Sequence, residues 1–557
     1  MNNLKCFFLT AALTALPWGS VCEAQTVTPQ ACEQSIVTPK AEGRYLWLPI
    51  EESAPEGKVQ VIVNGMMQME QNVRMARERV DYYVALDLQP YQNKGRTLRV
   101  CVQNVPTGSL CFSKMAQNDD ADFSLINEKF RPQYHHAPKR GWMNDPNGMF
   151  YLDSTWHLFY QYNPYGSMWG NMHWGHSTST DLIHWKDEGV ALAPDVWGTM
   201  FSGSCVVDKE NTAGFGRGAV VAMYTASRPT PFGGDVQAQC LAYSTDGGKT
   251  FTKYEGNPVL TAEDKDFRDP NMFWNEDIKA WNLILAVGQE MRIYSSPDLK
   301  TWKEESRFGG ELGCHGGVWE CPDLFPLTLN SQHSTLNSKK WVLLCNINPG
   351  GPFGGSATQY FVGDFDGHRF TVDDASRYAE GKALWMDYGK DHYATVSFSN
   401  APDGRRTVMA WMSNWEYANN VPTKQFRSAN SIARDLFLYR AGKEYYLGSR
   451  PAKEYEGKGL DKTYRVKGST TIRLTNAEGD EFVIAYDQKA MTLSCDRTQC
   501  GDTSFSEHFP TVTVAPVHRK LTSIRVFIDK CSVEVFGNDG EVVLTNLVFP
   551  ASPLKHL

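Results

Sequence analysis

Three features are missing from this sequence, and each absence excludes a class of protein. After the first residues there is no run of about 18 or more apolar residues, so no transmembrane segment is expected. The 55 Lys and Arg residues stand against 63 Asp and Glu, a formal net charge of −8, and no basic cluster occurs, so nucleic acid is not an expected partner. The 13 cysteines form no C-x-x-C pair, which argues against structural zinc.

One histidine pair has the spacing of metal ligands. His173 and His176 are separated by two residues in His-Trp-Gly-His, but no third ligand lies nearby in the sequence. Protein metal sites usually take three or four side-chain ligands. The sequence therefore predicts no metal site.

The first residues have the pattern of an export signal. A charged start is followed by the short apolar run Cys6–Pro17 and by small residues suited to cleavage, so residues 1–24 are predicted to be a signal peptide. The protein is then exported to a periplasmic, cell-surface or extracellular location. Cys22 is a candidate for a lipid anchor, although Gly19-Ser20-Val21 before it matches a lipoprotein signal poorly, so anchoring is the less favoured alternative.

Eleven cysteines remain after removal of that segment. Export permits disulfides, and the spacings of Cys101 with Cys111 and of Cys495 with Cys500 would close small hairpins. An odd total leaves at least one thiol free.

A small accessory domain is predicted over residues 26–122. Short apolar runs with a period of two alternate with turns, without helical stretches between them, which is typical of a β-sandwich. The polar stretch Gln117–Asp122 is interpreted as a linker. The predicted strands are Tyr45–Ile50, Val59–Val63, Tyr82–Leu86 and Thr97–Cys101.

A repeated turn pattern organises residues 131–436. An Asp that opens a turn, followed by an aromatic residue that begins the next strand, occurs at Asp181, Asp246, Asp298 and Asp366, at steps of 65, 52 and 68 residues. Such steps are typical of the four-stranded blades of a β-propeller. Roughly 300 residues at this step predict five blades.

The last segment, residues 440–557, returns to strands with a period of two and is predicted to be a second β-sandwich. Asp529 and Glu534 lie in this segment and are interpreted as parts of a solvated strand face rather than catalytic groups. The predicted strands are Thr470–Leu474, Glu481–Ala485, Ser523–Phe527, Ser532–Phe536 and Glu541–Thr545.

Three short runs place an acid beside a proline or an aromatic residue. The first is Gly141–Gly148, Gly-Trp-Met-Asn-Asp-Pro-Asn-Gly, and the others are Phe267–Pro270 and Trp319–Asp323. Pro146 disfavours the helical conformation for Asp145, and Asn147-Gly148 is typical of a turn. Asp145 is therefore expected at the end of a strand or in a turn, with its carboxylate projecting.

In this order the three runs resemble the signature of glycoside hydrolase family 32, the fructan and sucrose β-fructosidases, and the resemblance extends from Arg131 to the C-terminus. It implies an all-β fold, a five-bladed propeller followed by a β-sandwich. It also implies retaining, exo-acting hydrolysis of β-fructofuranosyl bonds in levan or inulin, with sucrose as a further candidate substrate, release of fructose, and no cofactor.

The resemblance assigns roles to individual residues. Asp145 matches the nucleophile, Glu320 the acid/base and Asp269 the acid that stabilises the transition state. Amide donors beside Asp145 are expected to hold it ionised. Strand starts from different blades meet at one mouth of a propeller, so the three acids are expected to converge there. The matching substrate contacts are Trp142, Asn144, Gln161, Trp169, Phe201, Ser202, Arg268 and Trp411.

Three alternatives remain open. A fructosyltransferase of the same family differs only in whether water or a sugar accepts the fructosyl group. A non-catalytic fructan-binding surface protein is a second alternative, although all three acids are present. A sialidase is a third, because Ser244–Phe251 looks like an Asp-box turn, but sialidases use a Tyr nucleophile and the three acids would then have no role.

Overall fold

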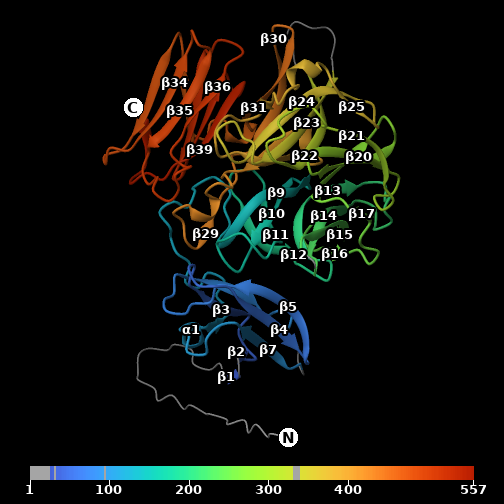
Figure 1. The fold of residues 1–557 in the computed structure, drawn as a ribbon, viewed down its shortest axis with the longest axis vertical. Helices are drawn as coiled ribbons and strands as arrows, with labels where there is room; N and C mark the ends of the chain where they lie inside the picture. Colours follow the sequence, from blue (N-terminus) through green and yellow to red (C-terminus); the bar gives the residue numbers. More distant parts are fainter. Residues whose placement is uncertain (1–25, 31–32, 93–95, 232, 330–338, 557) are drawn as a thin grey trace. The chain divides into compact units, whose positions relative to one another are not determined.

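The computed structural model describes residues 26–556 except 31–32, 93–95, 232 and 330–338 (Figure 1). The predicted signal peptide and Cys22 lie outside the described residues. The chain divides into two compact units, with the boundary between Phe123 and Ser124. Among the described residues, no helix is both long and apolar enough to cross a membrane.

The first unit is built from two antiparallel sheets and one short helix, α1 (Cys111–Lys114). All four strands predicted for this region are confirmed, and alternate residues along β4 and β6 are buried, as the period of two requires. One sheet has the order β1 (Thr26–Gln30), β2 (Gln34–Thr38), β7 (Leu98–Gln103), β4 (Gly57–Val63), β5 (Met66–Val73); the other is β6 (Tyr82–Asp87), β3 (Tyr45–Ile50), β8 (Ala116–Asn118).

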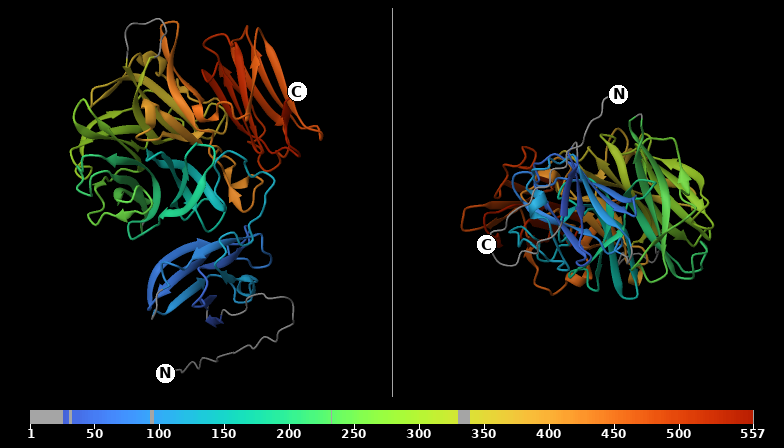
Figure 2. Two further views of the ribbon diagram at one scale, coloured as in Figure 1. Left: turned by 180° about the vertical axis from the view of Figure 1, so that it is seen from behind. Right: turned by 90° about the horizontal axis from the view of Figure 1, so that it is seen from below.

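The second unit begins with five antiparallel sheets, which confirm the predicted five-bladed propeller (Figures 1 and 2). The innermost strands β9, β13, β18, β22 and β27 contact one another in turn, and β27 returns to β9. The short strand β29 (Phe426–Arg427) follows the second strand of the fifth blade in the chain. It pairs in parallel with β9 and so links the last blade to the first.

The blades have the following strands. The first contains β9 (Gly141–Leu152), β10 (Thr155–Asn163), β11 (His173–Ser179) and β12 (Lys186–Leu192); the second β13 (Thr199–Asp208), β14 (Ala219–Pro229), β15 (Asp235–Ser244), β16 (Thr252–Lys253) and β17 (Leu260–Thr261); the third β18 (Phe267–Asn275), β19 (Ala280–Val287), β20 (Glu290–Ser296) and β21 (Lys303–Phe308). The fourth contains β22 (Val318–Thr328), β23 (Lys339–Asn348), β24 (Ala357–Phe365), β25 (Phe370–Val372) and β26 (Leu384–Trp385), and the fifth β27 (Tyr393–Ser397), β28 (Thr407–Trp411), β30 (Arg434–Ala441) and β31 (Glu444–Pro451).

The repeated aspartates occupy one place in each of the first four blades, the turn between the third and fourth strands. The carboxylate of Asp181 accepts hydrogen bonds from the backbone N–H of Ile183 and His184. Asp246, Asp298 and Asp366 each accept two such bonds from residues that follow them in the turn. The predicted turn function of this repeat is confirmed.

The fifth blade extends further than the expected end of the propeller at residue 436. Its strand β30 pairs with β28 and β31 pairs with β30, so the propeller continues to Pro451. Propeller strands and sandwich strands share the period of two, so the sequence pattern does not mark the change from one to the other.

The predicted C-terminal sandwich is present, with two antiparallel sheets around a core that includes Leu474, Ile484, Val526 and Val535. All five predicted strands are confirmed. One sheet has the order β32 (Asp461–Arg465), β37 (Ser523–Asp529), β38 (Ser532–Gly537), β39 (Val542–Leu547); the other is β36 (Val512–Pro516), β35 (Thr492–Gln499), β34 (Glu481–Asp487), β33 (Thr470–Thr475), β40 (Lys555–His556).

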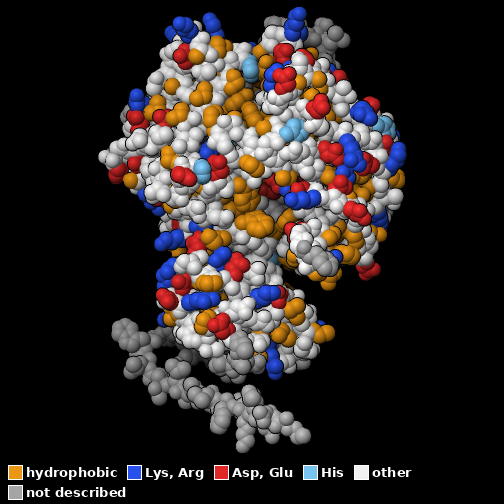
Figure 3. Space-filling view, in the orientation of Figure 1, with side chains coloured by type: hydrophobic (Ala, Val, Ile, Leu, Met, Phe, Trp, Pro, Cys, Tyr) orange, Lys and Arg blue, Asp and Glu red, His pale blue; other side chains and the backbone are white. Residues whose placement is uncertain are grey.

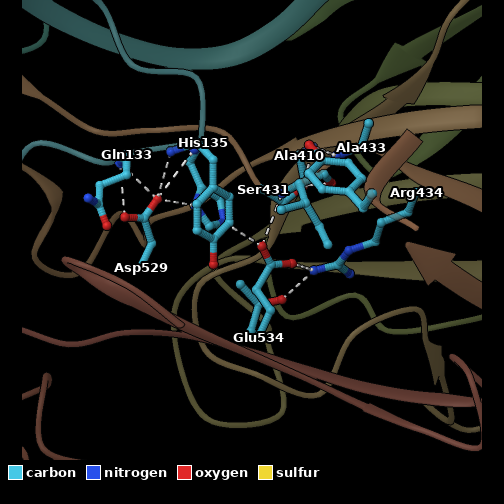
Figure 4. A network of polar contacts seen from close by, with 12 residues as sticks. Gln133, His135, Ala410, Ser431, Ala433, Arg434, Asp529 and Glu534 are labelled. Carbon is cyan, nitrogen blue, oxygen red and sulfur yellow. Dashed lines mark hydrogen bonds and ion pairs between the residues drawn. The ribbon is translucent and has the colours of Figure 1, made fainter. Parts of the chain in front are cut away.

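The interpretation of Asp529 and Glu534 as a solvated strand face is wrong. Asp529 is 5% exposed and Glu534 is fully buried, because the start of the second unit covers them. Asp529 accepts hydrogen bonds from the backbone N–H of Gln133 and Tyr134, and His135 lies between the two carboxylates, at 2.8 Å from Asp529 Oδ2 and 2.7 Å from Glu534 Oε1 (Figure 4).

A buried guanidinium completes this network. Arg434 forms ion pairs with Glu534 and, at 2.8 Å, with Asp387, and it also donates to Thr545 Oγ1 at 2.6 Å. These contacts join the fifth blade to strands β38 and β39 of the sandwich. Buried charges are tolerated only when they are paired in this way.

The cysteines with hairpin spacing do not form disulfides. Cys101, Cys111, Cys495 and Cys500 are all free and buried. In the cores of the two sandwiches, these buried thiols pack as small apolar side chains.

Charged side chains of both signs are interspersed over the described surface on the face shown in Figure 3, and neither sign forms an extended patch there.

Candidate active site

Each innermost strand of the propeller carries a β-bulge at the same level. In β9, Asn144 and Asp145 together lie opposite Gln161, between the pairs Tyr162–Met143 and Tyr160–Pro146. A bulge inserts one extra residue into a strand and turns a side chain away from its regular direction. The corresponding bulged pairs are Phe201-Ser202 in β13, Asp269-Pro270 in β18, Cys321-Pro322 in β22 and Ala394-Thr395 in β27.

The bulges explain how a strand can contain these sequence runs. Asp145 was expected at the end of a strand or in a turn, but β9 continues from Gly141 to Leu152 and the bulge accommodates Pro146. Three of the other bulges place a non-glycine residue at positive φ: 64° at Asp269, 42° at Cys321 and 54° at Ala394. Strained backbone of this kind is concentrated at functional sites.

Bulged residues of β9, β13 and β18, together with the residues that directly precede the bulges of β22 and β27, line one cavity of about 240 Å³. All three predicted acids contribute to it. The full lining is Asn144, Asp145, Gln161, Trp169, Phe201, Ser202, Arg268, Asp269, Glu320, Asn348, Tyr393 and Trp415. The acids thus come from three different blades but face the same small space.

Asp145 and Asp269 are connected through Cys321. The Cys321 thiol lies 3.5 Å from Asp145 Oδ2 and 3.6 Å from Asp269 Oδ2, and the backbone N–H of Cys321 donates to Asp269 Oδ2 at 3.0 Å. Asp145 also accepts hydrogen bonds from Asn144 Nδ2 at 2.9 Å and from Ser202 Oγ at 2.7 Å. Each carboxylate is therefore held in a fixed direction.

Glu320 is held by a different pair of groups. Arg268 donates to Glu320 Oε1 at 2.9 and 3.2 Å, and the Tyr393 hydroxyl donates to Glu320 Oε2. The same guanidinium lies 4.0 Å from Asp269 Oδ2 and pairs with Asp266 at 2.7 Å. Arg268 is thus the cation shared by the acid cluster.

Burial dominates the protonation equilibria of Asp145 and Asp269. The pKa of Asp145 is raised above its ordinary value by burial and by the charge of Glu320, and the donors Asn144, Ser202 and Cys321 offset this only in part. The expectation that amide donors hold Asp145 ionised thus underestimated desolvation. Burial also raises the pKa of Asp269 to about 7, although Arg268 opposes the shift.

Two predicted substrate contacts, Trp142 and Trp411, do not reach the cavity. Both are fully buried and pack against Trp415, with ring centroids 5.7 and 4.8 Å apart respectively. Trp142 Nε1 donates to Asn144 Oδ1 at 2.8 Å. The two indoles therefore support residues that line the cavity.

Three lining residues were not predicted: Asn348, Tyr393 and Trp415. Trp415 lies beyond the end of β28, whereas Trp411 is the last residue of that strand, so strand position could have separated the two tryptophans. Tyr393 and Asn348 have no acid-proline or other motif beside them, and the sequence gives no signal for either.

The histidine pair has other partners. His176 Nε2 lies 3.1 Å from His157 Nδ1, and His173 Nδ1 contacts the carbonyl of Asn171. Within the described ranges, no group of three or more His, Cys, Asp or Glu side chains is arranged to hold a metal ion.

Comparison with known proteins identifies the family of this chain. Residues 135–451 match the model of the glycosyl hydrolases family 32 N-terminal domain, and residues 460–557 match that of the family 32 C-terminal domain. This chain belongs to glycosyl hydrolase family 32. The family 32 regions are preceded, at residues 32–134, by a match to a domain of unknown function, DUF4980.

Individual family 32 relatives agree with this placement. A levanase of Bacillus subtilis is 42% identical over 506 residues, covering 83% of this chain and 72% of the relative. An extracellular exo-inulinase of Aspergillus awamori is 38% identical over 494 residues, covering 77% and 91%. The crystal structure of exo-inulinase from A. awamori superposes with a TM-score of 0.70 at 38% identity, covering 77% of this chain and 95% of that one. The protein is a glycoside hydrolase.

Proposed function

We propose that this family 32 enzyme is an exo-acting fructan β-fructosidase, which removes fructose from the ends of levan or inulin chains and from sucrose. The convergence of three acids in a single small cavity, two of them beside Arg268, carries this proposal. A cavity of about 240 Å³ suits one terminal sugar unit better than the middle of a polymer. Relatives named levanase and exo-inulinase support fructans as the substrate class.

In the proposed reaction, Asp145 attacks the anomeric carbon of the terminal fructosyl unit while Glu320 gives its proton to the leaving oxygen. Glu320 then removes a proton from water, which attacks the covalent fructosyl-enzyme, releases fructose and restores the Asp145 carboxylate. The fixed direction of Asp145, set by Asn144 and Ser202, supports its role as the nucleophile. The exposed fifth of the Glu320 side chain supports proton exchange with the leaving group and water.

Asp269 is proposed to hydrogen-bond substrate hydroxyls more strongly as positive charge develops on the sugar ring. Arg268 is proposed to orient both Glu320 and Asp269 through its fork of donors. Gln161 Nε2 is buried without a hydrogen-bond partner, so it is available to a sugar hydroxyl. Trp169, which is 46% exposed and contacts Phe201 edge-on, is proposed as a stacking wall at the entrance, and Trp142 and Trp411 as supports behind the lining.

The test is the Asp145→Asn variant assayed on levan, inulin and sucrose. Fructose release should be lost on all three while the circular dichroism spectrum stays unchanged. Asp153→Asn is the matched control, because Asp153 is an exposed turn residue that follows the same strand. Release of fructose by Asp145→Asn at the wild-type rate would refute the proposal, and chromatography of products at high sucrose separates hydrolysis from fructosyl transfer.

Export of the enzyme is proposed from the pattern of residues 1–24. A relative named as extracellular supports it. N-terminal sequencing of the enzyme from the culture medium, periplasm and membrane fraction tests it. A mature chain that begins at Cys22 and partitions into the membrane fraction would favour the lipid-anchored alternative, and an intact Met1 in the cytoplasm would contradict export.

A further inference from the structure

A second cavity lies along the same five inner strands, on the other side of the bulges. Its volume is about 540 Å³, more than twice that of the acid cavity. In β9, Asn144 and Asp145 line the acid cavity, whereas Gly148 and Met149, further along the strand, line the second cavity. The other four inner strands follow the same order, so the two cavities occupy successive levels of the propeller.

The second cavity opens to solvent through a charged rim. The side chains of Glu210, Glu276 and Lys279 line it and are 70%, 72% and 74% exposed. Its size falls within the range of about 300–1,000 Å³ that is usual for small-molecule sites. The cavity therefore has the volume for a mono- or disaccharide, and its exposed rim is separate from the residues that line the acid cavity.

Charges of both signs lie deeper in the cavity, joined by one serine. The backbone N–H of Ser397 donates to Asp323 Oδ2 at 2.8 Å, and the Ser397 hydroxyl accepts from the guanidinium of Arg406 at 3.2 Å. Asp323 is only 3% exposed. Burial raises the pKa of Asp323 and lowers the pKa of Arg406, and the charge of each group opposes the shift of the other.

This lining selects for a neutral ligand with many hydroxyl groups. The charges of Asp323 and Arg406 offset each other, so the pair gives little net attraction to an ion of either sign, whereas a hydroxyl group can donate to the carboxylate and accept from the guanidinium. The indoles of Trp274 and Trp281 also line the cavity, in edge contact with ring centroids 5.2 Å apart. Aromatic walls combined with a few placed polar groups are the usual composition of a small-molecule site.

We propose that this second cavity is a non-catalytic binding site for a neutral mono- or disaccharide. The choice of fructose as the probe rests on the proposed function, because fructose would be the product released at the acid cavity.

The test measures how many fructose molecules bind to the full chain, by equilibrium dialysis against labelled D-fructose. Two per chain are expected in the wild type. Val207→Phe should leave one bound fructose per chain, because the larger ring would fill part of the cavity. Val207 lines the cavity and is partly exposed, so the ring can be accommodated without disturbing the core. Asp323→Asn should weaken the same binding event about tenfold, because it removes a charged hydrogen-bond acceptor. Val512→Phe, an exposed site on the sandwich, is the matched control.

Hydrolysis is measured on the same preparations. Both Val207→Phe and Asp323→Asn should keep wild-type kcat/KM on sucrose, which also shows that they fold. One fructose per chain in the wild type, or two in Val207→Phe, would overturn the inference. If these preparations still hydrolyse sucrose, the proposed function stays intact. Two bound fructoses without any hydrolysis would instead refute the proposed function and support the second site.

Discussion

The ion network around His135 predicts how stability depends on pH. The imidazole is fully buried between Asp529 and Glu534; burial lowers its pKa, but the hydrogen bonds and charges of the two carboxylates together outweigh burial and raise the pKa from 6.5 to about 9. A group whose pKa is raised on folding stabilises the folded state below its unfolded pKa, and this contribution is lost as the pH rises through the folded pKa. The stabilisation by His135 is therefore complete below pH 6.5 and lost at about pH 9 and above.

The size of the effect follows from the shift. At 1.36 kcal/mol per pKa unit, a rise from 6.5 to about 9 corresponds to about 3 kcal/mol of unfolding free energy. The assay is urea denaturation of the enzyme at about pH 6 and about pH 10, at constant ionic strength, followed by tryptophan fluorescence. The urea midpoint should fall as the pH rises.

Two variants separate His135 from other groups that titrate in this range. His135→Gln should lower stability at pH 6 and show a shallower decline with pH. His184→Gln should keep the wild-type decline, because His184 pairs with Asp181 at the surface, with 84% of its side chain exposed. A wild-type midpoint that does not change over this interval, or an equal decline in His135→Gln, would refute the protonated state assigned to the buried imidazole.

Three further predictions concern the site and the thiols. Arg268→Gln should move the acidic limb of the kcat/KM–pH profile to higher pH by roughly one unit or more, because loss of the guanidinium raises the pKa of Asp269. An acidic limb at the wild-type pH would exclude Asp269 as the group that titrates there. Trp142→Phe should lower kcat roughly fivefold with little change in KM, because one hydrogen bond to Asn144 is lost behind the cavity; a raised KM with unchanged kcat would indicate direct contact with substrate. Reduction with dithiothreitol should leave the Tm unchanged, since the described cysteines are free. A native disulfide would contribute about 2–5 kcal/mol to the free energy of unfolding, and its loss would lower the Tm by several degrees.

Local chemistry made much of the fold and of the acid cavity predictable. The aspartate turns recur because each carboxylate accepts hydrogen bonds from the next few backbone N–H groups, so they mark four blades in the sequence. Asp145 and Asp269 are each followed by proline, and Glu320 precedes Cys-Pro, so these bulges leave a trace in the sequence.

Features that depend on distant contacts were not predictable. The strand pattern around Asp529 and Glu534 does not reveal that Gln133–His135 and Arg434, from far earlier in the chain, bury both acids. Desolvation of Asp145 likewise depends on how closely the blades meet. The bulges in β13 and β27 have no proline, so Tyr393 gave no signal.

The repeated bulge makes the acid cavity a joint product of all five blades. Each blade presents one short reactive segment to the shared space, while the rest of its sheet packs against its neighbours. Ser202 holds Asp145, and Arg268 and Tyr393 hold Glu320, across blade boundaries, so a change in one segment also acts on the acids of other blades. For protein engineering, a change in sugar contacts therefore calls for substitutions that are matched between blades.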